Sequence, residues 1–123
     1  MSAPEMGQTA LEYVNASKRE QAAGNHVKAA ALMWQATQAT FAALADAHGV
    51  ELKSLDEDDL IMLARRLEAD GSVPKWRYRG GLSPGSLLKD HAEMEVLESY
   101  QLDLAYETAE QFIRGCFGNQ PSH

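Results

Sequence analysis

Apolar residues recur along the first part of this chain at steps of three and four positions, the spacing that places side chains on one face of an α-helix. The pattern predicts a helix over residues 9–23, with Thr9 as its N-cap and Gly24 supplying the left-handed conformation that ends it. The residues expected to face inward are Ala10, Leu11, Tyr13 and Val14.

The clearest helical pattern follows, between Asn25 as N-cap and Gly49 as the stop. Nine alanines favour a helix here and allow neighbouring helices to approach closely. The positions that share the expected inward face are Val27, Ala31, Trp34, Gln38, Phe41, Ala45 and His48. We therefore predict one long amphipathic helix.

A third helix is expected from Ser54 to just before Gly71, because Ser54 and Glu57 have the spacing of a capping box. Acidic residues in its first turn suit the positive end of the helix dipole. Its expected inward side chains are Leu55, Leu60, Leu63, Ala64 and Leu67.

Residues 72–86 contain two prolines and three glycines, which predict a long loop rather than a regular helix. A final helix or helix pair is expected over residues 87–116, followed by a frayed tail at 118–123. Its core candidates are Leu88, Val96, Leu97, Tyr100, Leu104, Ala105, Phe112, Ile113 and Cys116.

These elements predict an all-α fold, an antiparallel up-down bundle of four helices, or five if the last region is a pair, with a long loop before the last helix. The length of 123 residues fits a single domain, 1–123. No internal repeat beyond the first helix pair is evident.

Charge and cysteine content narrow the function classes. Eleven Lys and Arg against eighteen Asp and Glu give a net charge of −7, which argues against a general nucleic-acid coat protein. The single cysteine, Cys116, excludes an internal disulfide and a multi-cysteine zinc site. With no signal-peptide pattern and no apolar run long enough for a membrane span, we expect a cytoplasmic protein without membrane contact.

One segment departs from this acidic character. Lys75, Trp76, Arg77, Tyr78 and Arg79 place three cations and two aromatic rings in five consecutive positions. If the segment is extended, the cations lie on one side and the rings on the other, an arrangement able to pair phosphates while a base stacks. Alternatively, the rings fix the loop to the bundle or to a second subunit while the cations stay in water.

Other candidate chemistry is weaker. The acidic residues between Lys89 and Arg114 are best explained as a solvated face, and the Glu-x-x-His pattern of di-iron bundles is missing, so no metal and no cofactor are expected. Cys116 falls in the core pattern and is expected to be a buried thiol. The glycine-rich nucleotide motifs and the serine nucleophile elbow are absent from the sequence.

The front half carries LEY at residues 11–13, AAGNHVKAA at 22–30, WQA at 34–36 and ADAHGV at 45–50. This pattern resembles the HEPN domain family (higher eukaryotes and prokaryotes nucleotide-binding), especially its small stand-alone prokaryotic members. The resemblance covers residues 9–70 and, more loosely, 90–117. A competing resemblance, to a tetratricopeptide helix pair, ranks lower because one unit is present and a solenoid needs about three.

The HEPN resemblance implies a four- or five-helix bundle, frequent homodimers, and roles as nucleotide-binding partners of minimal nucleotidyltransferases or as RNA-cleaving toxins of toxin–antitoxin systems. The nuclease branch is marked by an Arg followed by four to six residues and a His. Arg19 and His26 have six residues between them but straddle the first turn, outside the later helical region where the family motif lies. His91 is too far from Arg77 or Arg79.

Three functions follow as hypotheses. The first is a non-catalytic module that binds a nucleotide or an RNA end through residues 75–79, as a partner of a nucleotidyltransferase. The second is a metal-independent ribonuclease that uses Arg19, His26 or His91. The third is a structural protein–protein interaction module.

Overall fold

A computed structural model describes residues 3–69 and 77–117 of the chain and contains five helices in this part. They are α1 (Ala3–Ala22), α2 (His26–Ala47), α3 (Glu57–Ala69), α4 (Arg77–Met94) and α5 (Ser99–Cys116). Within the described ranges there is no strand, which confirms the all-α fold.

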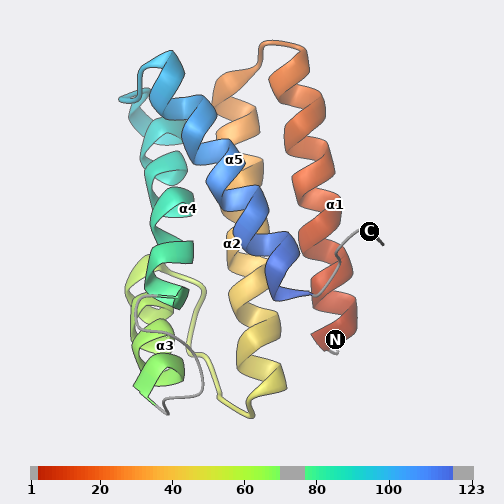
Figure 1. Cartoon of the computed structure of the whole chain (residues 1–123), viewed down its shortest axis with the longest axis vertical. Helices are drawn as coiled ribbons and strands as arrows, with labels where there is room; N and C mark the ends of the chain where they lie inside the picture. Colours follow the sequence, from red (N-terminus) through yellow and green to blue (C-terminus); the bar gives the residue numbers. More distant parts are fainter. Residues whose placement is uncertain (1–2, 70–76, 118–123) are drawn as a thin grey trace.

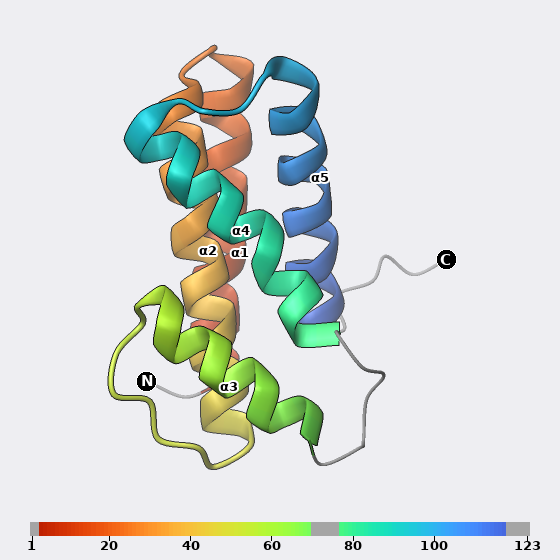
Figure 2. The same ribbon diagram turned by 90° about the vertical axis from the view of Figure 1, so that its left-hand side faces the viewer.

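The helices form an antiparallel bundle around α2. In Figure 1, α1 and α4 run upward while α2 and α5 run downward. The shorter α3 lies across the lower end of the bundle beside the start of α4 (Figure 2). Helix α2 contacts each of the other four helices, whereas α1 contacts α2 and α5 alone among them. The antiparallel bundle expected from the sequence is therefore confirmed, and because the last region forms the pair α4 and α5, the number of helices is five.

The glycine turns agree with the sequence prediction, but the start of the first helix does not. Gly24 and Gly49 have φ values of 83° and 68°, the left-handed conformation that ends α1 and α2. The predicted cap at Thr9 is wrong, because α1 begins at Ala3 and the Thr9 hydroxyl donates to the Glu5 carbonyl at 3.0 Å inside the helix.

The predicted capping box at Ser54 is also wrong. Helix α3 begins at Glu57. The Ser54 hydroxyl accepts a hydrogen bond from the Asp56 amide, which precedes the helix, and donates one to the Asp59 carboxylate in its first turn. The Glu57 side chain instead accepts a hydrogen bond from the Ser86 hydroxyl of α4. Glu57 therefore joins two helices rather than closing the end of its own.

The largest difference from the sequence prediction lies in residues 77–86, which are helical and not a loop. The glycines allow close packing: a Cβ at Gly81 would overlap the Phe112 ring, and one at Gly85 would meet Thr37 at 2.5–2.9 Å. Pro84 has no amide N–H to donate to the carbonyl of Gly80, four residues earlier, and Gly80 is solvent-exposed. Tertiary packing thus overrides the local helix-breaking signal.

The core has two clusters of buried side chains. One lies between α1, α2, α5 and the second half of α4, and the other between α2, α3 and the first half of α4. Phe112 packs against both clusters and stacks on Phe41 with ring centres 5.7 Å apart. Most predicted core residues are buried or partly buried, but several are exposed, namely Val27, His48, Leu55, Val96, Tyr100 and Leu104.

Candidate functional site

The basic and aromatic segment begins helix α4 in the structure. Lys75 and Trp76 lie outside the described residues, while Arg77, Tyr78 and Arg79 form the first turn of α4. The extended alternation considered from the sequence is therefore wrong for these three residues. Arg77 is exposed, whereas Tyr78 is buried and its ring meets the Phe112 ring edge-on at 6.5 Å.

A buried carboxylate occupies the start of α4. Glu68 accepts hydrogen bonds from the backbone N–H groups of Tyr78 and Arg79, both at 2.9 Å, and its other oxygen lies 2.7 Å from the Arg79 Nε. The first N–H groups of a helix have no partner within the helix and attract anions. Glu68 therefore holds, from within the chain, the position where a helix N-terminus would bind an external anion.

This environment controls the ionisation of Glu68. Burial opposes the charged form, but the hydrogen bonds from the Arg79 backbone, the Arg79 side chain and the Tyr78 backbone, together with the Arg79 charge, outweigh it and lower the pKa of the carboxyl. Glu68 and Arg79 thus act as an ionised structural pair that fixes α3 to the first turn of α4.

Exposed cations surround this junction. Five of the eleven basic residues of the chain fall within residues 65–79. Arg65, Arg66 and Arg77 are exposed on α3 and α4, and Arg66 also lines, with Lys53, a surface hollow of about 300 Å³. Asp59 and Glu51 lie in the same hollow. We call the group formed by Arg65, Arg66 and Arg77 the basic end of the α3–α4 junction.

The ribonuclease candidates lie in two different environments. Arg19 and His26 flank the turn between α1 and α2, where both are exposed and no hydrogen bond or ion pair joins them. His91 is buried in the last turn of α4, and its Nδ1 accepts the Leu97 amide at 3.1 Å. That bond makes His91 a cap for the connection between α4 and α5.

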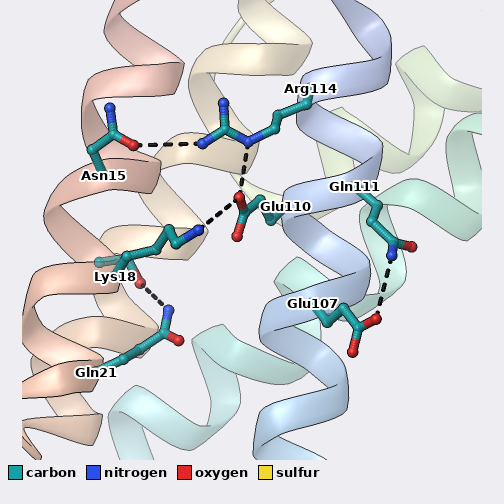
Figure 3. A network of polar contacts seen from close by, with 8 residues as sticks. Asn15, Lys18, Gln21, Glu107, Glu110, Gln111 and Arg114 are labelled. Carbon is teal, nitrogen blue, oxygen red and sulfur yellow. Dashed lines mark hydrogen bonds and ion pairs between the residues drawn. The ribbon is translucent and has the colours of Figure 1, made fainter. Parts of the chain in front are cut away.

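Part of the acidic face of α5 is engaged in a polar network with α1 (Figure 3). The Glu110 carboxylate lies 3.1 Å from the Lys18 Nζ and 2.8 Å from the Arg114 Nε, and Arg114 also reaches the Asn15 side chain at 3.5 Å. Burial opposes ionisation of Glu110, but the hydrogen bonds and charges of Arg114 and Lys18 prevail and lower its pKa. The predicted solvated acidic face therefore does not extend to Glu110, which is partly buried and paired with Lys18 and Arg114.

Two further observations bear on chemistry. Burial raises the pKa of the Cys116 thiol to about 11, against a smaller opposing effect of the Arg77 charge, so the thiol is protonated at neutral pH. Among the described residues, no group of three or more His, Cys, Asp and Glu side chains is arranged to hold a metal ion.

The fold and these surfaces define a five-helix bundle with an exposed basic end and a buried carboxylate beneath it. Comparisons with protein-family models, with curated proteins and with solved structures find no match for this chain. No helix in residues 3–69 and 77–117 combines the length and the hydropathy that a membrane span requires.

Glu68 is the site residue that sequence reasoning missed. It follows Leu60 and Ala64 at steps of four, so the helical period places its carboxylate beside the apolar face of α3. A charged residue at such a position signals a buried pair. That signal identifies Glu68 but not its partners, because the first turn of α4 reads as a loop in the sequence.

Proposed function

We propose that this chain is a non-catalytic helical module whose basic end binds a phosphate-bearing ligand, a nucleotide or an RNA end. The observation that carries the proposal is that Arg65, Arg66 and Arg77 are all exposed, on the two helices that Glu68 joins, in an otherwise acidic protein. Guanidinium groups pair with phosphate oxygens in a geometry that a lysine cannot match.

The five residues predicted from the sequence take different roles in this proposal. Arg77 is the direct contact, together with Lys75 and Trp76, which lie outside the described residues. Tyr78 and Arg79 support the surface from beneath, since the Tyr78 ring packs in the core and Arg79 pairs with Glu68. Because Glu68 already occupies the helix N-terminus, the ligand is held by side-chain cations and not by the first amides of α4.

A binding role agrees with the state of the candidate catalytic groups. The Nδ1 of His91 accepts the Leu97 amide, so this ring nitrogen is already engaged within the chain. A ribonuclease using Arg19 and His26, a nucleotidyltransferase partner, a homodimer and a cytoplasmic location remain predictions of the sequence and of the HEPN resemblance.

The test is the thermal unfolding of the purified protein with ATP, AMP and a short single-stranded RNA. A ligand at 100 times its Kd adds about 2.7 kcal/mol, which raises the midpoint by roughly 4–8 °C for a small domain. We expect a shift with at least one ligand and its loss in Arg65→Ala/Arg77→Ala. The control, Arg19→Ala/Lys28→Ala, removes the same charge from exposed positions of α1 and α2.

Equal shifts in the two double variants would contradict the proposal, because the effect would then follow net charge alone. Absence of any shift in the wild-type protein would also contradict it. Cleavage of the RNA that is lost in His26→Ala would instead support the ribonuclease reading.

A further inference from the structure

Large apolar side chains are exposed where α4 ends and α5 begins. Of the eight that are exposed in the described part of the chain, four fall within residues 94–104: Met94, Val96, Tyr100 and Leu104, with exposed fractions of 66, 54, 69 and 63%. This turn lies at the upper end of the bundle in Figure 1, at the far end of α4 from Arg77. We call these four residues the apolar patch.

Tyr100 and Leu104 belong to a face of α5 that no other helix covers. The buried residues Leu102, Tyr106, Ala109 and Ile113 form the opposite, inward face of that helix. Tyr100 and Leu104 are four residues apart, so their side chains lie one above the other toward solvent. Exposed apolar side chains that gather in one part of a chain, with polar residues around them, mark interaction sites.

The rim of the patch is acidic. Glu93, Glu95, Glu98, Asp103 and Glu107 are all exposed, and no Lys or Arg occurs between Lys89 and Arg114. Glu93 is paired with Lys89 at 3.0 Å, whereas no hydrogen bond or ion pair of the Glu95 and Asp103 side chains occurs within the described residues. Carboxylates without internal partners remain available to an external cation.

The backbone at Glu95 gives a further indication. Glu95 has a φ of 50°. It is the one non-glycine residue with a positive φ among the residues that the structure describes. This left-handed region disfavours a side chain, whereas glycine adopts it without strain. A carboxylate is therefore held beside the patch at a position that favours glycine.

We propose that the apolar patch docks a basic amphipathic segment of another protein, with apolar side chains covering Tyr100 and Leu104 and Lys or Arg pairing with Glu95 and Asp103. The acidic rim excludes nucleic acid and opposes a symmetric contact between two copies, since both would bring like charges together. This surface is separate from the basic end, and the docking proposal does not depend on ligand binding there.

The test uses a helical model peptide of about 15 residues made of leucine and lysine, with binding followed by calorimetry. We expect binding that weakens with added salt and that falls by about tenfold or more in Tyr100→Ser/Leu104→Ser. The matched control is Leu55→Ser/Met62→Ser, which removes two exposed apolar side chains near α3. It should bind as the wild-type protein does.

A second pair of variants tests the charges. Glu95→Gln/Asp103→Asn should bind more weakly and with a smaller salt dependence, while Glu12→Gln/Glu51→Gln, exposed elsewhere, should change neither. All of these positions are exposed, and circular dichroism of each variant verifies that the helices are intact.

Several results would overturn the proposal. The leucine–lysine peptide could fail to bind the wild-type protein. A control variant could lose as much binding as the matching patch variant, or a leucine–glutamate peptide could bind as well as the leucine–lysine peptide. A dimer of the free protein that dissociates in Tyr100→Ser/Leu104→Ser, seen by sedimentation, would assign the patch to a second copy instead.

Discussion

Glu68 and Arg79 are eleven residues apart in the chain and meet across the α3–α4 junction, with the Glu68 Oε1 2.7 Å from the Arg79 Nε. The same carboxylate accepts both the Tyr78 and the Arg79 backbone N–H groups. One buried side chain therefore serves both as the partner of an arginine and as the cap of a helix.

Replacing Glu68 should lower the stability of the fold. Glu68→Gln keeps the shape but removes the charge, and we expect a loss of about 1–3 kcal/mol in the free energy of unfolding by urea. Glu12→Gln, at an exposed position of α1, should change it by less than about 0.5 kcal/mol. Equal stability of the two variants would show that the Glu68 pair contributes nothing.

The lowered pKa of Glu68 also predicts a dependence of stability on pH. Its contribution is fully present above the ordinary pKa of 4.5 that applies in the unfolded chain, and it is lost as the pH falls through the lower pKa of the folded state. As the pH is lowered, the free energy of unfolding measured in urea should therefore fall more steeply for the wild-type protein than for Glu68→Gln. Parallel curves would contradict this assignment.

Replacing the adjacent glycines Gly80 and Gly81 of α4 by alanine should change the stability of the fold in opposite directions. Gly81→Ala forces a methyl group into the Phe112 ring and should cost about 1–3 kcal/mol or more. Gly80→Ala has no heavy atom within 4 Å of the new Cβ and should stabilise the helix by about 0.5 kcal/mol. Midpoints of thermal unfolding distinguish the two, and a shift of the same sign in both would argue against the packing of α4 described above.

Replacing His91 by alanine should destabilise the fold, whereas the same replacement of His26 should not. His91→Ala leaves a cavity and an unpaired Leu97 amide, so we expect a loss of about 2–3 kcal/mol in chemical unfolding. The exposed His26 side chain has no such contacts, and His26→Ala should be nearly neutral. An unchanged free energy of unfolding in His91→Ala would show that the His91 imidazole has no structural role.

The thiol of Cys116 should react slowly with iodoacetamide at neutral pH. Because burial raises its pKa to about 11, the thiolate fraction is small and the rate should rise steadily as the pH approaches that value. Rates are compared with those of free cysteine over the same pH range. A plateau near pH 8 would mean that the thiol is far more acidic than its surroundings imply.

Sequence reasoning predicts the bundle well where local and tertiary signals agree. Helix α2 combines many alanines with a helical apolar period, and Gly24 and Gly49 end the first two helices as expected. The sequence predicts a loop for the first turns of α4 because glycine and proline report local preference, whereas the fit of Gly81 against Phe112 depends on a residue 31 positions away.

The face of α5 is predicted only in part, for a different reason. Ala105 and Ile113 are buried as predicted, but Tyr100 and Leu104 are exposed and Leu102 is buried instead. Periodicity identifies two apolar stripes on this helix without saying which one meets the bundle. The candidate site has the same limit. The sequence identifies Arg77 as a candidate, but only the helical structure of this turn shows that Arg77 is exposed while the next residue, Tyr78, is buried.

The glycines and the proline of α4 have a consequence for the order in which the protein assembles. Three glycines and Pro84 make residues 77–86 roughly 6 kcal/mol less favourable as a helix than alanine would be. We therefore expect this segment to become helical only once α2, α3 and α5 are in place to receive it, whereas the alanine-rich α1–α2 hairpin can form from local contacts. We therefore expect the amides at the start of α4, which carries Arg77, to exchange with solvent faster than those in the middle of α2.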